Sequence, residues 1–318
     1  MNSTAEPVSS AAGGLRDDLE RAIGAVNGII VDKAEVVELA FSALLAGGHL
    51  LIEDLPGVGK TTLAQTLSLV LGGHWQRVQF TNDMLPADIL GVSVYRREDE
   101  QFEFRPGPVF ANVVLADEIN RATPRTQSAL LEAMAEGQVT VDGQTHSLPR
   151  PFFVIATQNP LDLAGTYPLP DSQLDRFLLR TAVGYPSAAE ERRLLTEPDR
   201  RQMLDSLTPE LDSQRVLGLI ALAADLHVAE PVLDYIQALI QATRTHAGLR
   251  AGLSPRAALA LIRTARAHAL VCRQDFCLPE NVKRVFPYLA GHRLQPLPES
   301  GLDSSAIVSE IVEQTAVP

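Results

Sequence analysis

The sequence predicts an α/β fold in which a mainly parallel sheet lies between helices and is followed by a smaller, all-helical domain. Short apolar runs alternate with amphipathic helical segments between residues 50 and 183, which is typical of a parallel sheet with both faces covered. After Pro186-Ser187 the apolar spacing is helical throughout. Since 318 residues are many for one core, we expect an α/β domain over residues 15–185 and a helical domain over residues 186–318.

The composition is typical of a globular protein from a reducing compartment. Hydrophobic residues make up 46% of the chain, but no run of about eighteen apolar residues offers a direct membrane span. A net charge of −12 disfavours broad attachment to nucleic acid or anionic lipid. Cys272 and Cys277 fit no disulfide framework, which favours free thiols and a cytoplasmic location. Residues 1–14 are rich in Ser, Ala and Gly without a secretion pattern, so we expect a disordered lead-in.

Two helices precede the first predicted strand, over Leu15–Ile30 and Lys33–Leu45, because apolar residues recur at helical spacing in both. The strand then leads into a glycine-rich turn and a helix start, and residues 50–64 read Leu-Leu-Ile-Glu-Asp-Leu-Pro-Gly-Val-Gly-Lys-Thr-Thr-Leu-Ala. A nucleotide triphosphate needs unpaired backbone N–H groups, a mobile cation and a metal-anchoring hydroxyl at one point. In this segment Lys60 would reach the β- and γ-phosphates, and Thr61 would hold Mg²⁺.

The motif G-x-x-x-x-G-K-[ST] is met except at its first position, where Asp54 replaces glycine. Asp tolerates turn conformations, so we keep the assignment of a phosphate-binding loop over its alternative, an ordinary turn between a strand and a helix. The residues predicted to bind ATP or ADP in this loop are Pro56, Gly57, Val58, Gly59, Lys60, Thr61 and Thr62. Val31, in the turn between the two preceding helices, is predicted to lie beside the adenine.

The elements after the loop lead toward a second polar sheet edge. We expect a helix over Thr62–Leu71, a strand over Arg77–Phe80 and a brief helical turn over residues 85–91. Two alternating segments, Val92–Arg96 and Gln101–Arg105, flank a charged turn. They suggest an inserted hairpin or helix with an exposed tip.

Asn112–Glu118 is an apolar run that ends in two carboxylates, as expected of a buried parallel strand that delivers acids to its carboxyl edge. Asp117 would hold Mg²⁺ directly or through water, and Glu118 would polarise the attacking water as general base. Alone, the run fits a strand before a solvated acidic turn equally well. The phosphate-binding loop favours the catalytic interpretation.

Four further segments complete the predicted α/β domain. Thr123-Pro124 caps a helix, and residues 138–148 have the alternation and Asp-Gly turn of a β-hairpin, whose tip either touches a substrate or faces solvent. Phe152–Thr157 is a strand followed by Asn159, whose amide would orient the attacking water or sense the γ-phosphate. Alone, it would be a turn-forming Asn. Residues 178–183 resume a strand pattern.

The final part of the chain is predicted to be helical. Helices are expected over residues 188–196, 213–226, 231–246, 255–271 and 279–290. Ser254-Pro255 forms a cap followed by a helix start, so Arg256 would emerge from the first turn. A lid would swing this guanidinium onto a phosphate, although the pattern fits a solvated surface arginine equally well.

These segments together resemble the MoxR family of AAA+ ATPases, from about Leu15 to the final helix. The resemblance rests on Leu-Pro-Gly-Val-Gly-Lys-Thr at residues 55–61, Ala-Asp-Glu-Ile-Asn-Arg-Ala at 116–122, Ala-Thr-Gln-Asn-Pro at 156–160 and Leu-Pro-Asp-Ser-Gln-Leu-Asp-Arg-Phe at 169–177. It implies a P-loop AAA+ domain with a helical lid. It also implies that Asn159 is the first sensor, Arg176 the arginine finger that enters a neighbour's site, and Arg256 the second sensor. Asp54 is unexceptional within this family.

The resemblance further implies Mg²⁺-dependent ATP hydrolysis by an oligomer, since an arginine finger serves another subunit. Family members typically form hexameric rings and act with partners that carry a von Willebrand A-type domain, as chaperone-like machines. The segments 92–105 and 138–148 fall where relatives carry pore-facing or substrate-facing elements. Two other functions stay open: a nucleotide-gated binding switch with little turnover, and a nucleic-acid motor of a related AAA+ clade, which the acidic balance disfavours.

Overall fold

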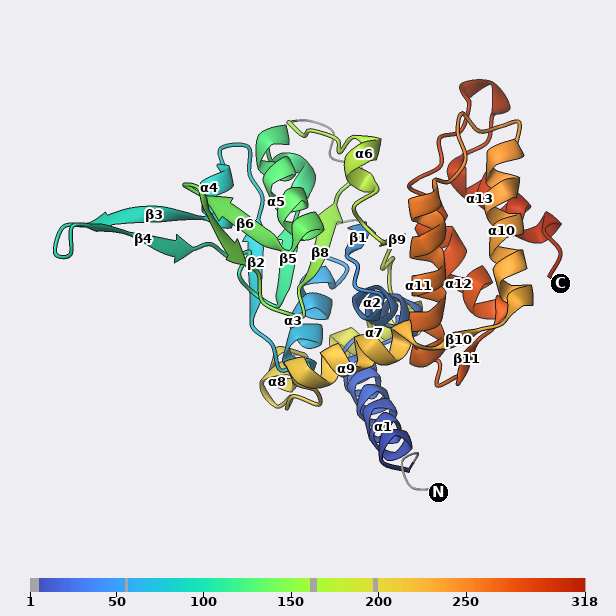
Figure 1. The fold of residues 1–318 in the computed structure, drawn as a ribbon, viewed down its shortest axis with the longest axis horizontal. Helices are drawn as coiled ribbons and strands as arrows, with labels where there is room; N and C mark the ends of the chain where they lie inside the picture. The colour runs from blue at the N-terminus through green and yellow to red at the C-terminus, as the bar shows by residue number, and fades with distance from the viewer. Residues whose placement is uncertain (1–5, 55–56, 161–164, 197–199, 318) are drawn as a thin grey trace, which may run out of the picture.

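A five-stranded parallel sheet forms the centre of the α/β part (Figure 1). The computed structural model describes residues 6–54, 57–160, 165–196 and 200–317. The sheet has the order β2-β5-β8-β1-β9, and each neighbouring pair is parallel. Its strands are β1 (Leu50–Glu53), β2 (Trp75–Gln79), β5 (Val113–Asp117), β8 (Phe153–Gln158) and β9 (Leu179–Thr181). The predicted mainly parallel sheet is confirmed.

Both faces of the central strands of this sheet, β5, β8 and β1, are buried, because their alternate residues point into two different cores. In β1, Leu50 and Ile52 belong to a core that includes α1, α2 and α3, whereas Leu51 belongs to a second core with α5. Strands β5 and β8 divide their side chains in the same way. The helices of the α/β part are α1 (Glu6–Ile29), α2 (Ala34–Leu45), α3 (Lys60–Val70), α4 (Pro86–Leu90), η1 (Ile119–Arg121), α5 (Pro124–Glu136) and α6 (Asp171–Leu174).

Helix α1 begins earlier than predicted. It starts at Glu6, so residues 6–14 are helical where a disordered lead-in was expected, while residues 1–5 lie outside the described residues. Once a helix has formed, each added residue gains a hydrogen bond for the dihedrals it fixes, so helices extend readily. Gly13 and Gly14 weaken such an extension by about 1 kcal/mol each relative to alanine without ending it. The prediction gave these glycines too much weight.

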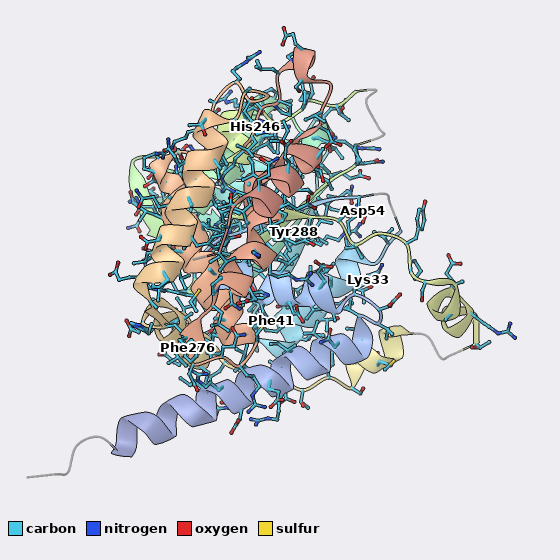
Figure 2. The ribbon with its side chains drawn as sticks, turned by 90° about the vertical axis from the view of Figure 1, so that its right-hand side faces the viewer. Lys33, Phe41, Asp54, His246, Phe276 and Tyr288 are labelled. Atoms are coloured by element: carbon cyan, nitrogen blue, oxygen red, sulfur yellow. The ribbon has the colours of Figure 1, made fainter. Side chains whose placement is uncertain are left out.

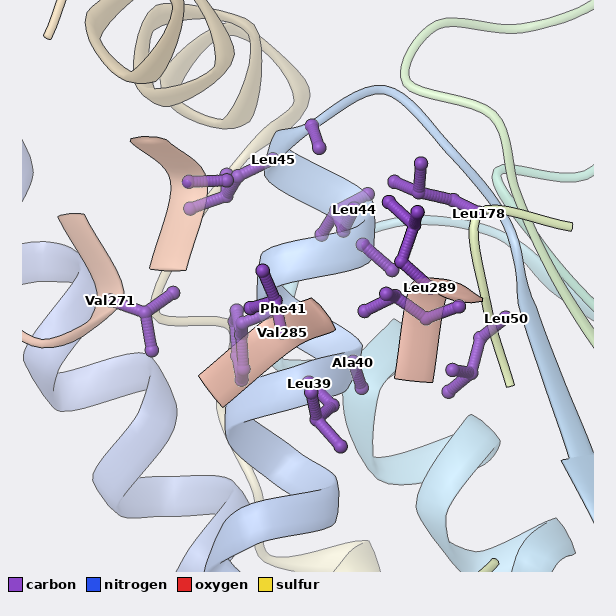
Figure 3. Close-up of a cluster of buried hydrophobic side chains, with 14 of the residues drawn as sticks. Leu39, Ala40, Phe41, Leu44, Leu45, Leu50, Leu178, Val271, Val285 and Leu289 are labelled. Atoms are coloured by element: carbon purple, nitrogen blue, oxygen red, sulfur yellow. The ribbon is translucent and has the colours of Figure 1, made fainter. Parts of the chain in front are cut away.

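The helices after residue 186 share a core with the first two helices of the chain. Figure 3 shows Phe41 and Leu44 of α2 beside Val285 and Leu289 of α12. One cluster of buried side chains extends from α1 to α13 and so crosses the predicted boundary at residue 186. The division into two domains stays a prediction. The packing nevertheless holds the later helices firmly against α2.

The chain after residue 186 contains more than the five helices predicted. It forms α7 (Ala188–Thr196), α8 (Arg200–Asp205), α9 (Ser213–Ala224), α10 (Glu230–Thr245), α11 (Pro255–Val271), α12 (Pro279–Ala290), η2 (Pro298–Ser300) and α13 (Ser304–Gln314). It also contains a parallel pair, β10 (His227–Val228) and β11 (Phe276–Cys277). The expectation that this part is helical throughout was therefore wrong, because two-residue strands are too short to show alternation.

Two antiparallel hairpins project from the α/β part (Figure 1). The predicted insert is a hairpin and not a helix, formed by β3 (Gly91–Arg96) and β4 (Gln101–Pro106). Its Tyr95 and Phe102 rings lie 5.3 Å apart between centroids, and Phe102 remains 73% exposed. The second hairpin, β6 (Gln138–Val141) with β7 (Gln144–Ser147), is also as predicted.

A buried histidine joins helix α5 to strand β8. The Nδ1 atom of His49 accepts a hydrogen bond from the Val154 N–H at 3.1 Å, so its Nε2–H is free to donate to the Met134 carbonyl at 3.2 Å. Burial lowers the pKa of His49 to about 4. The folded protein therefore keeps this imidazole neutral well below its ordinary pKa of about 6.5.

Acidification between pH 6.5 and about 4 is expected to destabilise the protein through His49. Over this range the unfolded chain binds a proton at this residue and the folded chain does not, so the free energy of unfolding falls by up to about 3 kcal/mol. Urea titrations at several pH values would measure this fall. His49→Gln keeps an amide donor and acceptor without titrating, and should reduce the pH dependence. His74 is exposed, so His74→Gln is the control and should leave the pH dependence of the free energy of unfolding unchanged. An undiminished slope in His49→Gln would contradict the assignment.

Candidate nucleotide site

The phosphate-binding loop lies between β1 and the first turn of α3. Gly57 and Gly59 have φ angles of 87° and 93°, a region that glycine enters without steric cost. A Cβ at either position would meet no atom within 4 Å, so the backbone conformation, and not crowding, requires glycine here. Gly59 immediately precedes α3, whose first N–H groups have no partner within the helix. The loop and helix therefore form a site suited to phosphate.

Lys60 is buried at the start of α3, at 8% exposure. Its Nζ donates to the Asp54 carbonyl oxygen at 3.0 Å, and the Asp54 Oδ2 accepts from the Gly184 N–H at 2.5 Å. The aspartate that departs from the common motif thus ties the loop to the chain that follows β9. Thr61 and Thr62 are half-buried in the first turn of α3, and Pro56 lies outside the described residues.

The turn that contains Val31 lies on this side of the molecule. Lys33 Nζ donates to the Tyr185 carbonyl at 2.7 Å, and the Ser187 N–H donates to Asp32 Oδ2 at 3.1 Å. Asp54 holds this same segment through Gly184, and Figure 2 shows Lys33 and Asp54 near each other. The half-buried Val31 is therefore next to chain that packs beside the loop, which is consistent with its predicted place.

The Asp117 carboxylate at the end of β5 is held by the two strands that flank it. Its Oδ1 accepts from the Thr157 hydroxyl at 2.6 Å, and its Oδ2 accepts from Arg77 Nη2 at 2.7 Å. Thr157 belongs to β8 and Arg77 to β2, the neighbours of β5 in the sheet. Asp117 is only 7% exposed, so this pairing offsets the cost of burying its charge.

Glu118 has a left-handed backbone, with a φ of 57°, an uncommon and strained conformation for a residue other than glycine. Its N–H donates to the Thr157 hydroxyl at 2.8 Å. Its carboxylate accepts from Gln79 Nε2 at 2.9 Å and forms an ion pair with Arg121 Nε at 3.0 Å. The backbone turn and these two partners hold the Glu118 carboxylate at the carboxyl edge of the sheet, where a general base is expected.

Sequence reasoning missed four residues that hold these acids: Arg77, Gln79, Arg121 and Thr157. The polar residues at alternate positions of β2 were a signal. This pattern did not show which residues the polar side chains contact, because only the sheet order places β2 beside β5. Arg121 lies only three residues after Glu118. The other three come from strands that are distant in sequence from the residues they hold, so spacing alone could not assign their contacts.

Asn159 follows β8, which lies between β5 and β1 in the sheet. The Asp54 N–H donates to the Gln158 carbonyl at 3.1 Å, so the loop after β1 runs directly beside the end of β8. The half-buried Asn159 thus lies between the acids of β5 and the phosphate-binding loop. The predicted convergence of Lys60, Asp117 and Asn159 on one sheet edge agrees with the structure.

The oxygen atoms at this edge suit a magnesium ion that a nucleotide brings with it. Thr61 offers a hydroxyl and Asp117 a carboxylate, and Mg²⁺ prefers such hard donors together with phosphate and water oxygens. Among the described residues, no group of three or more His, Cys, Asp or Glu side chains forms a metal cage. The donors therefore fit Mg²⁺ bound together with phosphate.

Arg176 and Arg256 lie at the opposite edge of the sheet. Both line a cavity of about 200 Å³ together with Gly48 and His49, which directly precede β1, and with Leu178, which directly precedes β9. In parallel strands these positions mark the amino edge. The role of Arg256 as the second sensor on the lid stays a prediction, and the helix that carries it, α11, packs on α2.

This cavity is strongly basic. Four arginines line it and Asp175 is its one carboxylate. Arg176 and Arg256 are among them, and Arg176 Nη1 donates to the Leu131 carbonyl at 3.0 Å. Arg263 lies two turns after Arg256 on the exposed face of α11. Such a cluster of guanidinium groups is suited to bind an anion such as phosphate.

Comparisons with known proteins agree with this geometry. Residues 49–179 match the family model of the ATPase family associated with various cellular activities (AAA), and residues 241–311 match that of the AAA lid domain. Chaperone MoxR1 of Mycobacterium tuberculosis is 41% identical over 317 residues, which cover 94% of this chain and 82% of that protein. The chain belongs to the MoxR family of AAA+ ATPases. Like other AAA+ ATPases, this MoxR chain binds nucleotide and hydrolyses ATP.

Further MoxR relatives align over most of the chain. Protein MoxR of Methylorubrum extorquens is 33% identical over 89% of both chains, and the uncharacterized protein YeaC of Bacillus subtilis is 43% identical over 94% of this chain and 95% of its own. A crystal structure of a protein from Cytophaga hutchinsonii superposes with a TM-score of 0.89 at 32% identity and covers 99% of this chain and 100% of that one. The fold of this chain is therefore shared over its whole length with that protein.

In the described part of the MoxR chain, no helix combines the length and the apolar character that a bilayer span requires.

Proposed function

We propose that this chain is an Mg²⁺-dependent ATPase that assembles into a ring, expected to be a hexamer, and uses hydrolysis for chaperone-like remodelling of a partner protein. One observation carries the proposal: the phosphate-binding loop and Arg176 lie at opposite edges of one parallel sheet. A strand of four residues spans about 13 Å, too far for one side chain to bridge. Arg176 therefore serves a nucleotide held by another copy.

In the proposed mechanism each subunit supplies most of one site, and its neighbour completes it. Lys60 and the first-turn N–H groups of α3 hold the β- and γ-phosphates. Thr61 and Asp117 hold Mg²⁺, which supplies charge neutralisation when it is bound. Glu118 accepts the proton of the attacking water, and Asn159 orients that water.

The neighbouring subunit contributes its basic cavity to the same site. Arg176 and Arg256 from that cavity approach the γ-phosphate and stabilise the negative charge that develops during transfer. Both arginines belong to one cavity, so a single docking event would bring them to the nucleotide together. The first and second sensors would then come from different subunits.

Mixing two inactive variants tests the intersubunit site. Arg176→Ala and Glu118→Gln should each be nearly inactive alone. Mixed oligomers should recover activity, because some interfaces unite an intact Glu118 with an intact Arg176. Phosphate release is measured over a range of mixing ratios, with mixed assembly confirmed by differential tags. No recovery in confirmed mixed oligomers would contradict the proposal.

The remodelling role is supported by the similarity to Chaperone MoxR1 of M. tuberculosis. The proposed partner carries a von Willebrand A-type domain. The hairpin β3–β4 projects from the α/β part (Figure 1). Its exposed Phe102 lies next to the last residue pair before the turn, so it is available for protein contacts. Cys272 and Cys277 are free thiols, which is consistent with the proposed cytoplasmic location.

A further inference from the structure

The segment that follows helix α12, residues 291–295, is bound to the turn that carries the proposed arginine finger. We call residues 171–178 the finger turn. Arg293 makes most of these contacts, and its side chain is only 7% exposed. Arg293 also lines the basic cavity, but the mechanism described above gives no role of its own to Arg293 or to the rest of residues 291–295.

The Arg293 guanidinium binds residues that come directly before and directly after Arg176 in the sequence. Its Nε donates to Asp175 Oδ1 at 2.7 Å. Its Nη2 donates to the Phe177 carbonyl at 2.7 Å, and its Nη1 donates to the Leu178 carbonyl at 3.1 Å. The residue before Arg176 and the two residues after it are thus bound by one planar cation.

Two neighbours of Arg293 reinforce this attachment. His292 donates from Nε2 to the Phe177 carbonyl at 3.0 Å, and Gln295 donates to the Asp171 carboxylate. Burial and the adjacent Arg293 charge lower the pKa of His292 well below its ordinary value, so it acts as a neutral donor. The segment after α12 therefore binds the finger turn from its start to its end.

We propose that Arg293 is a positioning residue, which fixes the finger turn so that Arg176 reaches the neighbouring subunit's nucleotide and which couples the lid helix α12 of one subunit to hydrolysis in the next. This inference rests on the proposed intersubunit function. The guanidinium matters because its planar, forked donors reach a carboxylate and two backbone carbonyls at once. A lysine ammonium at this position would keep the charge, but it could not donate hydrogen bonds to all three of these acceptors in the same geometry.

Small displacements of the finger turn should have a large effect on the rate of hydrolysis. The Arg176 side chain is anchored by the bond from its Nη1 to the Leu131 carbonyl, and its approach direction also depends on the backbone that Arg293 holds. Misplacement of a catalytic cation by about 1 Å can cost roughly a hundredfold in rate. A shift of α12 relative to the sheet would move Arg293 and the finger turn together.

Arg293→Lys tests the inference in the full-length protein. The variant should hydrolyse ATP at least roughly tenfold more slowly, with KM and the affinity for a fluorescent ATP analogue within about twofold of wild type. The control is Arg284→Lys in the preceding helix α12, where Arg284 pairs with Glu35 at 3.0 Å. It should keep wild-type turnover. A wild-type kcat in Arg293→Lys would overturn the inference.

Subunit mixing separates a finger defect from a defect in the variant's own nucleotide site. Arg293→Lys mixed with Glu118→Gln should recover activity, because the Glu118→Gln subunit supplies a well-placed finger to an intact base. Arg293→Lys mixed with Arg176→Ala should stay as slow as Arg293→Lys alone, because both lesions affect the same side of the interface. The reverse pattern, or recovery in neither mixture, would overturn the inference.

A second variant covers the case in which Arg293→Lys does not fold, as judged by thermal unfolding. Asp175→Asn removes the charged partner of Arg293 and leaves the backbone carbonyls in place, and it should give the same mixing pattern. The reference mixture of Arg176→Ala with Glu118→Gln distinguishes a failure of the intersubunit function from a failure of the role of Arg293. Failure of that reference would overturn the intersubunit function together with this inference. Recovery in the reference alone would overturn only the role of Arg293.

Discussion

Lys60→Ala is expected to weaken ATP binding by at least roughly a hundredfold and to bring hydrolysis to background. Each charge-assisted hydrogen bond contributes about 1.5–3 kcal/mol, and Lys60 is placed to reach two phosphates. The buried Lys60 lies at the start of α3, beside the loop formed by Gly57 and Gly59. Titration with a fluorescent ATP analogue measures the affinity, and phosphate release measures the turnover.

Lys283→Ala is the matched control for this variant. Lys283 is an exposed lysine of α12 that lies 6.0 Å from the centre of the Tyr235 ring, and its loss should leave ATP affinity unchanged. Circular dichroism should give the same helix content for both variants. Wild-type ATP affinity in Lys60→Ala would remove the assignment of the phosphate-binding loop.

Glu118→Gln is expected to bind ATP normally and to hydrolyse it roughly a hundred to ten thousand times more slowly, the range that a general base contributes. A glutamine is close to isosteric and its amide oxygen still accepts from Gln79 and Arg121, which now hold the carboxylate. The local fold should therefore persist while proton acceptance is lost. Single-turnover phosphate release, with ATP binding measured in parallel, separates the two effects.

The exposed Glu132 of α5 provides the control for the charge change. Glu132→Gln should retain full turnover, since this side chain lies away from the carboxyl edge of the sheet. If Glu118→Gln kept more than about a tenth of wild-type kcat, Glu118 would not be the general base. Loss of both binding and turnover would instead indicate a structural role for Glu118.

Local patterns predicted the parallel sheet and the position of the two acids at the end of β5, because the relevant physics lies within a few residues. The apolar runs at β1, β5 and β8 had to be buried strands, and strands in a parallel sheet end at a common edge. Lys60 and Asp117 therefore belonged together before any coordinates were known. Short elements such as β10 and β11 escaped because two residues show no period.

Arg256 shows where sequence reasoning reaches its limit. Ser254 accepts from the Ala257 N–H and caps α11 as predicted, so the arginine does emerge from a first helical turn. No local pattern states which edge of the sheet that turn faces. The packing of α11 on α2 decides this, and it places Arg256 with Arg176 in the basic cavity.

By itself, then, the sequence determined the phosphate-binding loop, the acid pair, the parallel sheet and the family, because each depends on residue type and on spacing along one short segment. Only the tertiary structure decided that Arg77 and Thr157 hold Asp117, and that Arg293 holds the finger turn. These contacts join residues about 40 to 118 positions apart. Which distant segments meet is decided by the burial of whole helices and strands in a shared core, and that is a property of the packed chain.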